Sequence, residues 1–167
     1  MATQIGVQMY TLRDHCQTPV DIAKTCKKLK DMGFGAIQAS AAGFNTIDGQ
    51  ELRKILDDTG LICAATHQSL DQLRDPGKCL DFHAALDCEL TAIGGFHGET
   101  EAQWRDFVKD YNALSAQFAG KPLRIGYHNH SHEFAPFGTP AMGVLTPYQL
   151  LADELEDDVW FELDTYW

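Results

Sequence analysis

Short apolar runs alternate with helix-forming stretches along the chain of 167 residues, and this alternation constrains its fold more than any other feature. Each apolar run has the length of a strand, and the following stretch repeats apolar residues at helical spacing. Parallel strands joined by right-handed helical crossovers produce such a pattern, so we expect an α/β fold. The expected strands are 5–9, 36–39, 61–66, 91–96, 123–128 and 159–163, and the expected helices are 19–32, 48–59, 80–86, 99–118 and 147–156.

Polar side chains follow several different strands, and their positions separate two parallel architectures. A doubly wound sheet usually carries a glycine-rich phosphate turn after its first strand. Here segment 10–14 follows that strand without a glycine, and we expect 11–18 to be a polar loop. Functional residues at the C-terminal ends of many strands are typical of a (β/α)8 TIM barrel of about 250 residues. We therefore predict one partial TIM-barrel domain over 1–167, with strands one to six present and strands seven and eight absent.

The composition excludes several classes of function. The net charge of −11 and the pI near 4.9 disfavour binding to nucleic acid and to anionic membranes, because both need basic surface. No apolar run reaches the roughly 20 residues of a membrane span, and the N-terminal residues form no export signal. The five cysteines are scattered without C-x-x-C spacing, which predicts reduced thiols in a cytoplasmic protein.

The densest group of chemically active side chains lies at 127–134, at the end of the fifth expected strand. It holds His128, His130, His132 and Glu133 within eight residues. Such a group favours a metal site or a proton-transfer site at the end of a strand. The last expected strand ends in a similar way, because Asp164 follows its apolar residues.

At these residues the sequence resembles the sugar phosphate isomerase/epimerase family, also called xylose isomerase-like barrels. Four segments carry the resemblance and occur in the family's order, and the last two are the most specific. They are 6–14, 29–34, 127–130 with Glu133-Phe134, and 161–164 with Tyr166-Trp167. The resemblance implies a divalent-metal barrel that acts on sugars or polyols, and a chain that stops after strand six.

The resemblance also implies roles for individual residues. Glu133 and Asp164 match two of the family's four metal ligands, and the other two, a His and a Glu, would come from strands seven and eight. Such a set suits Mn²⁺, Mg²⁺ or Co²⁺, and less clearly Zn²⁺. The ion would polarise a substrate carbonyl or hydroxyl, and Glu133 would take a proton from the neighbouring carbon. Gln38, His132 and Trp167 depart from the family, which commonly carries Glu, an aromatic residue and His at these places.

Each candidate site residue also has a structural alternative. Glu133 is either the ligand and base or a solvated loop carboxylate, and Asp164 is either a ligand or a turn residue. His128 and His130 share one face by strand alternation. They either serve substrate and support a metal ligand, or they are buried histidines bonded to the backbone. Trp167 is either a sugar-stacking platform or a frayed end.

The remaining histidines and aromatic residues receive simpler interpretations. His67 and His97 are candidate substrate-binding residues of a pocket. His15 and His83 are expected to be ordinary surface or helix residues. The aromatic stripe of Trp104, Phe107 and Tyr111 is expected in the core, and the acidic residues at 153–158 are expected to form a solvated helix end.

The sequence therefore favours a metal-dependent sugar or polyol isomerase or epimerase that works by proton transfer next to a polarised carbonyl. The alternatives are a dehydratase-type lyase on an inositol-like substrate and a non-catalytic truncated barrel with a residual sugar-binding role. An apurinic-site endonuclease is less favoured because the chain is acidic. Open strand edges in an incomplete barrel predict self-association, and we expect little activity from the 167 residues alone.

Overall fold

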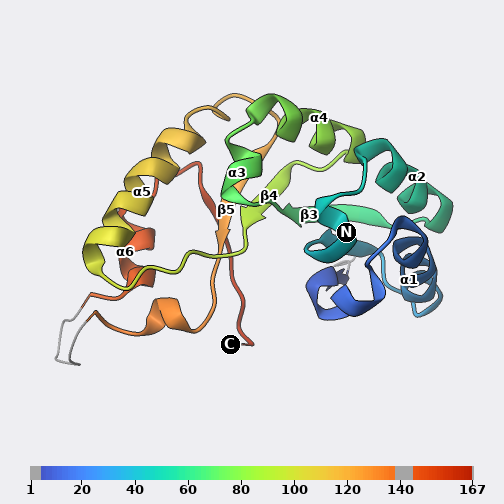
Figure 1. Cartoon of the computed structure of the whole chain (residues 1–167), viewed down its shortest axis with the longest axis horizontal. Helices are drawn as coiled ribbons and strands as arrows, with labels where there is room; N and C mark the ends of the chain where they lie inside the picture. Colours follow the sequence, from blue (N-terminus) through green and yellow to red (C-terminus); the bar gives the residue numbers. More distant parts are fainter. Residues whose placement is uncertain (1–4, 138–144, 167) are drawn as a thin grey trace. The chain divides into compact units, whose positions relative to one another are not determined.

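Six parallel strands alternate with helices in the computed structural model, which describes residues 5–137 and 145–166 (Figure 1). Along the sheet the strands follow one another in the order of the sequence. This is the predicted α/β fold, an incomplete barrel of the (β/α)8 TIM type. The strands are β1 (Gly6–Gln8), β2 (Ala36–Ala39), β3 (Ile62–His67), β4 (Leu90–Ile93), β5 (Arg124–His128) and β6 (Trp160–Glu162).

The predicted helices all form, and the described residues add four short helices and change several helix bounds. Segment 11–18 is not only a polar loop, because most of it belongs to the 3-10 helix η1 (Met9–His15). Helix α4 begins earlier than predicted, since the Asp75 side chain caps it and Pro76 occupies its first turn. The other helices are α1 (Pro19–Asp31), η2 (Ala42–Asn45), α2 (Gly49–Thr59), α3 (Leu70–Leu73), α4 (Pro76–Leu86), α5 (Glu101–Ser115), η3 (His132–Phe134) and α6 (Pro147–Glu154).

The chain divides into two compact units, and the first covers Met1–Thr91. In it β1 pairs with β2 and β2 pairs with β3, with a shift of register between Ile37 and Gln38. Helix α1 is capped by Thr18, whose side chain accepts a hydrogen bond from the backbone N of Asp21. The apolar faces of these helices pack with the strands into one core that includes Ile22, Cys26, Ile37, Leu52, Leu56 and Leu86.

His83 corrects a sequence interpretation, because this helix residue is buried rather than on the surface. Its Nδ1 lies 2.7 Å from the carbonyl oxygen of Cys79, so Nδ1 carries a proton and donates it. Its Nε2 lies 2.7 Å from the hydroxyl of Thr66 and accepts from it. Burial lowers the pKa of His83. His15 is exposed, as predicted.

The second unit covers Ala92–Trp167, and β5 pairs with β6 within it. The aromatic stripe of α5 is buried, as predicted, and the Tyr111 hydroxyl donates a 2.6 Å hydrogen bond to the carbonyl of Gly126 in β5. The side chain of Asn112 joins α5 to the end of α6, through bonds of 2.8 Å to Glu154 O and 3.0 Å from Glu156 N. These contacts hold α5 against β5 and against the end of α6, next to the strands that lead to the candidate site.

Two further sequence expectations concern cysteines and membranes. All five cysteines are buried and free, in agreement with the prediction of reduced thiols. Among the residues that the structure describes, no helix has both the length and the apolar character needed to cross a membrane.

Candidate functional site

The C-terminal ends of β5 and β6 carry most of the candidate residues, all within the second unit. Strand β5 ends at His128, and the chain then passes through Asn129 and His130 into η3, which holds Glu133. Strand β6 ends at Glu162, two residues before Asp164. Because β5 and β6 are parallel and paired, their C-terminal ends lie at the same edge of the sheet.

Glu133 is fully buried, with 0% of its surface exposed, and each of its carboxylate oxygens accepts a hydrogen bond. The Tyr127 hydroxyl donates to Oε1 at 2.9 Å, and the backbone N of His130 donates to Oε2 at 2.8 Å. Tyr127 in turn accepts a 3.0 Å bond from the backbone N of Phe96. The solvated loop carboxylate considered from the sequence is therefore wrong.

The same contacts fix the state of Tyr127. Burial raises the pKa of its hydroxyl far above the ordinary value, and the negative charge of Glu133 raises it further. Tyr127 therefore stays a proton donor to Glu133 at any pH in the physiological range. The sequence interpretation gave Tyr127 no role. Strand alternation places its side chain on the opposite face of β5 from His128.

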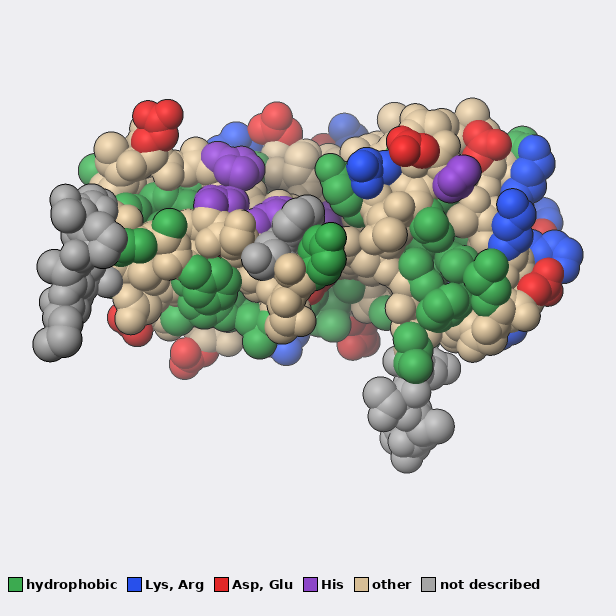
Figure 2. Space-filling view, turned by 90° about the horizontal axis from the view of Figure 1, so that it is seen from below, with side chains coloured by type: hydrophobic (Ala, Val, Ile, Leu, Met, Phe, Trp, Pro, Cys, Tyr) green, Lys and Arg blue, Asp and Glu red, His purple; other side chains and the backbone are tan. Residues whose placement is uncertain are grey.

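Two histidine side chains lie beside Glu133, and Figure 2 shows histidine side chains at the surface of one face. The Nε2 of His132 lies 3.4 Å from Oε1 of Glu133, and the Nδ1 of His130 lies 3.9 Å from the same oxygen. The rings of His97 and His132 stack, with centroids 4.4 Å apart. Burial lowers the pKa of His130, and the neighbouring His128 lowers it further. His130 is thus held towards its neutral form, the form that can bind a metal ion.

His132 makes a second contact that limits its role. Its Nε2 is 2.9 Å from the carbonyl oxygen of Phe96, and a carbonyl only accepts, so this nitrogen carries the proton. His132, at a position where the resemblance implies an aromatic residue, therefore stacks and donates a hydrogen bond. It would have to release Phe96 before Nε2 could coordinate an ion.

His128 lies between two carboxylates. Its Nδ1 is 3.2 Å from Oε1 of Glu162, and its Nε2 is 3.6 Å from Oδ2 of Asp164. The rings of His128 and His130 lie edge to face at 4.9 Å, as expected for residues on one face. Glu162 received no role from the sequence interpretation, although it ends β6 just as His128 ends β5.

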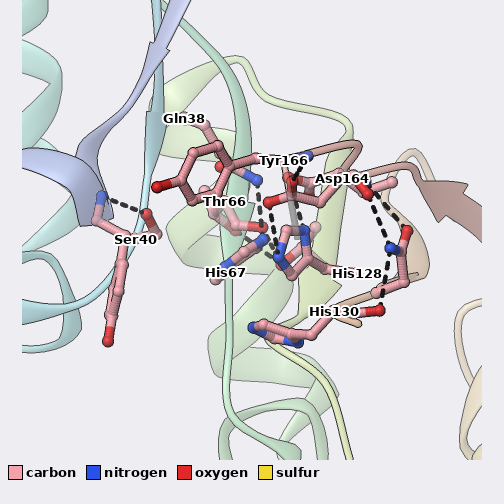
Figure 3. Close-up of polar contacts among 12 residues, drawn as sticks. Gln38, Ser40, Thr66, His67, His128, His130, Asp164 and Tyr166 are labelled. Atoms are coloured by element: carbon pink, nitrogen blue, oxygen red, sulfur yellow. Dashed lines mark hydrogen bonds and ion pairs between the residues drawn. The ribbon is translucent and has the colours of Figure 1, made fainter. Parts of the chain in front are cut away.

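Asp164 has the turn role considered from the sequence, and it also faces His128. Its Oδ1 accepts a 2.8 Å bond from the backbone N of Tyr166, while Oδ2 is the oxygen nearest to His128 (Figure 3). Asn129 holds the backbone of Asp164 in both directions, with Nδ2 donating to O at 2.9 Å and Asp164 N donating to Oδ1 at 3.0 Å. One side-chain oxygen thus shapes the turn, and the other remains directed at the histidine.

The other predicted site residues are distributed differently. His67 lies at the end of β3 in the first unit, where its Nε2 is 2.9 Å from the amide nitrogen of Gln38 (Figure 3). His97 follows β4 in the second unit and is exposed. Trp167 lies outside the described residues, so its predicted stacking role stays a prediction.

Three residues of the second unit form a possible metal site. His130, His132 and Glu133 each offer one ligand atom, and these atoms all lie within 4.8 Å of one another. Two imidazoles with a carboxylate suit Mn²⁺, Co²⁺ or Zn²⁺ better than Mg²⁺. The oxygens of Glu133 keep a lone pair each beside the hydrogen bond that they accept, so the donor chemistry fits a divalent ion.

No model of a known protein family and no curated protein matches the sequence. Solved structures do match. A sugar phosphate isomerase/epimerase from Parabacteroides distasonis is 22% identical with a TM-score of 0.80, and the match covers 100% of this chain and 67% of that one. A xylose isomerase-like TIM barrel protein from Mycobacterium smegmatis, in complex with magnesium, has a TM-score of 0.71 at 14% identity, over 98% of this chain and 65% of that one.

The fold is also shared outside the isomerase group. An AP endonuclease, family 2, from Brucella melitensis has a TM-score of 0.67 at 14% identity, over 98% of this chain and 69% of that one. The chain thus spans about two thirds of the length of these structures. At such identities the likeness establishes the xylose isomerase-like TIM-barrel fold, and the chemistry has to be argued from the residues.

Proposed function

We propose that this chain carries part of the active site of a metal-dependent sugar or polyol isomerase or epimerase. The observation that carries the proposal is Glu133, a fully buried carboxylate held by Tyr127 and by the backbone of His130. A carboxylate without a cation or donors is costly to bury, and this one has two donors and two histidine nitrogens within 4 Å. Such an environment supports a functional role, and the sugar phosphate isomerase/epimerase among the matching structures supports a sugar or polyol as the substrate.

In this proposal Glu133 and Asp164 would hold a divalent ion, with His130 and His132 as further donors or as neighbours that orient the site. When bound, such an ion would polarise the carbonyl or hydroxyl of the substrate. Glu133 would accept the proton from the adjacent carbon, and the bond from Tyr127 to Oε1 holds its carboxylate in one orientation. His128, between Glu162 and Asp164, orients both carboxylates through its two ring nitrogens.

The first experiment measures binding of Mn²⁺ to the full chain by calorimetry. We expect binding to the wild type, a loss of at least about tenfold in affinity for Glu133→Gln, and no change for Glu99→Gln. Glu99 is exposed, so this control makes the same chemical change outside the site. Equal binding by the wild type and Glu133→Gln, or no binding by either, would contradict the metal assignment.

The second experiment follows proton transfer itself. In the presence of Mn²⁺, this partial barrel should bring solvent deuterium slowly but measurably into the carbon next to the carbonyl of ketose substrates, and this exchange should disappear in Glu133→Gln. A dehydratase-type lyase would instead release water and form an unsaturated product from an inositol-like compound. A non-catalytic sugar-binding chain would bind ketoses with no exchange, and either result would overturn the isomerase proposal.

The endonuclease class remains less favoured. Binding to DNA is driven largely by basic residues that displace counterions, whereas this chain has a net charge of −11. Cleavage of a duplex with one abasic site by the metal-loaded chain would reverse this preference.

Self-association is proposed separately from catalysis. Strands at the ends of a sheet leave unpaired backbone groups that favour pairing with another chain. Sedimentation at increasing protein concentration should therefore reveal a dimer or a larger species, and a monomer at all concentrations would contradict it.

A further inference from the structure

A cleft of about 430 Å³ lies wholly within the first unit, away from Glu133 in sequence and in its lining. It is formed by η2, by the segment that follows β3, and by α3 and α4. Its volume falls in the range of about 300–1,000 Å³ that is typical of small-molecule sites. No residue assigned to the isomerase proposal lines it.

The floor of the cleft is apolar and aromatic. Phe44, Ile47 and Cys79 are each less than a tenth exposed, and Phe82 stands one helical turn beyond Lys78 on the same face of α4. Phe44 and Phe82 both line the cleft, and phenyl rings favour the flat face of a ring in the ligand, because that face can pack against them without losing hydrogen bonds.

One polar side chain is buried within this apolar surround. Gln68 is only 7% exposed and lines the cleft. Among residues 5–137 and 145–166, nothing forms a hydrogen bond with its side-chain amide. Its amide oxygen and nitrogen are not sealed from solvent, so water in the cleft supplies their hydrogen bonds when no ligand is present. A ligand group in the cleft would supply them, and an amide needs a partner that both donates and accepts.

The charges at the rim balance in pairs. Asp71 lies 3.1 Å from Arg74, and Asp75 lies 3.1 Å from Lys78. Because each carboxylate has its own cation, the rim presents no unmatched charge to a ligand. This arrangement favours an uncharged compound over a phosphate or a carboxylate.

We propose that this cleft binds a small, uncharged ring compound carrying hydroxyl groups, with the Gln68 amide as its polar anchor and Phe44 and Phe82 against its ring face. A hydroxyl group is both donor and acceptor, so it satisfies the amide in a way that a purely apolar ring does not. The proposal is independent of the isomerase proposal, because the two sites share no residue.

The test is a titration of the ¹⁵N-labelled full chain by NMR. The probes are myo-inositol, a saturated hydroxylated ring, and phenol, an aromatic one. The Gln68 side-chain signals are identified as the pair missing in Gln68→Met. We expect them to shift with at least one probe, with a dissociation constant on the order of 1–10 mM for so small a ligand.

Variants then locate the binding. Followed by ligand-observed NMR, binding of the active probe should weaken by about tenfold or more in Gln68→Met and in Phe82→Ala. It should persist in Glu133→Gln and in Gln50→Met, which changes an exposed glutamine of α2. A response to inositol alone assigns a saturated ring to the site, and a response to phenol alone assigns an aromatic ring.

Two results would overturn the proposal. One is a Gln68 signal that does not move with either probe. The other is unchanged affinity in Gln68→Met, which would place the probe elsewhere. Since Gln68→Met replaces a buried amide by an apolar side chain of similar length, the variant is expected to fold.

Discussion

The side-chain amide of Asn129 pairs with the backbone of Asp164 in both directions, at 2.9 Å and 3.0 Å. Asn129 directly follows β5, and Asp164 lies just beyond β6. This pair therefore joins the two segments that carry Glu133 and Asp164, the two proposed metal ligands. The amide nitrogen of Asn129 donates to the carbonyl of Asp164, and its amide oxygen accepts from the backbone N of Asp164. Both bonds need a side-chain amide, which explains an Asn at this position.

Replacing Asn129 by Ala should weaken metal binding without touching a ligand. The change removes both hydrogen bonds and frees the backbone of Asp164, so we expect about tenfold lower affinity for Mn²⁺. We also expect unfolding free energy to fall by about 1–3 kcal/mol, because buried groups lose their partners. Calorimetry with Mn²⁺ and urea denaturation measure the two effects.

Asn45→Ala is the control, since Asn45 is exposed in η2. It should change the unfolding free energy by less than about 0.5 kcal/mol and leave the affinity for Mn²⁺ as it is. If Asn129→Ala binds Mn²⁺ as tightly as the wild type, the junction does not position Asp164 for the ion.

Removal of the Tyr127 hydroxyl should destabilise the fold and slow proton transfer. Tyr127→Phe leaves Oε1 of Glu133 and the backbone N of Phe96 without their partner. We expect a loss of about 1–3 kcal/mol in unfolding free energy, since both groups belong to a buried network. Urea denaturation measures the loss, and deuterium exchange into the substrate measures the activity.

A tyrosine outside the network provides the comparison. Tyr10 is 47% exposed, and Tyr10→Phe should stay within about 0.5 kcal/mol of the wild type. Equal stability of Tyr127→Phe and the wild type would mean that water replaces the hydroxyl at no cost.

The sequence predicted the elements whose signals are local. Strand β2 has the predicted bounds, α1 begins at the predicted residue, and α2 begins one residue after its predicted start. The short helix α3 was missed although Ser69 and Gln72 form a capping box, because four residues are too few to create a hydrophobic period.

The environment of the site residues could not be predicted in the same way. Glu133 is buried because Tyr127 and Phe96 meet it, and Phe96 lies on a distant segment of the chain. His83 of α4 is buried because Thr66 of β3 donates a hydrogen bond to it. A sequence pattern gives the period of an element, whereas such contacts depend on which elements become neighbours.

Acid should destabilise the protein in part through His83. Burial lowers the pKa of this histidine below its ordinary value of 6.5. Below pH 6.5 His83 therefore binds a proton in the unfolded chain more readily than in the folded chain. The stability linked to His83 is therefore complete above pH 6.5 and is lost as the pH falls, by at most about 1.4 kcal/mol per pH unit.

The measurement compares the wild type with His83→Gln by urea denaturation between about pH 7.5 and about pH 5.5. The variant should be less stable at the higher pH, because it loses the fit to Thr66 and Cys79. The difference in unfolding free energy between the two proteins should narrow as the pH falls, because only the wild type loses stability through the lowered pKa of His83. A constant or widening gap would contradict the assigned direction.

Gly126 should tolerate no side chain, because β6 lies against it. A Cβ built at this position would be 2.5 Å from the carbonyl oxygen of Trp160 and 2.6 Å from its indole ring. Trp160 is the register partner of Gly126, so the clash is with paired backbone that cannot move without parting the strands. Gly126→Ala should therefore lower the unfolding free energy by about 1–3 kcal/mol, the usual cost of overpacking, or by more.

Gly77→Ala makes the same change in α4, where the nearest atom is 3.7 Å away, and should raise the unfolding free energy by about 0.4–1 kcal/mol. Urea denaturation of both variants tests the contrast, and equal effects would show that β5 and β6 can separate at Gly126 without cost.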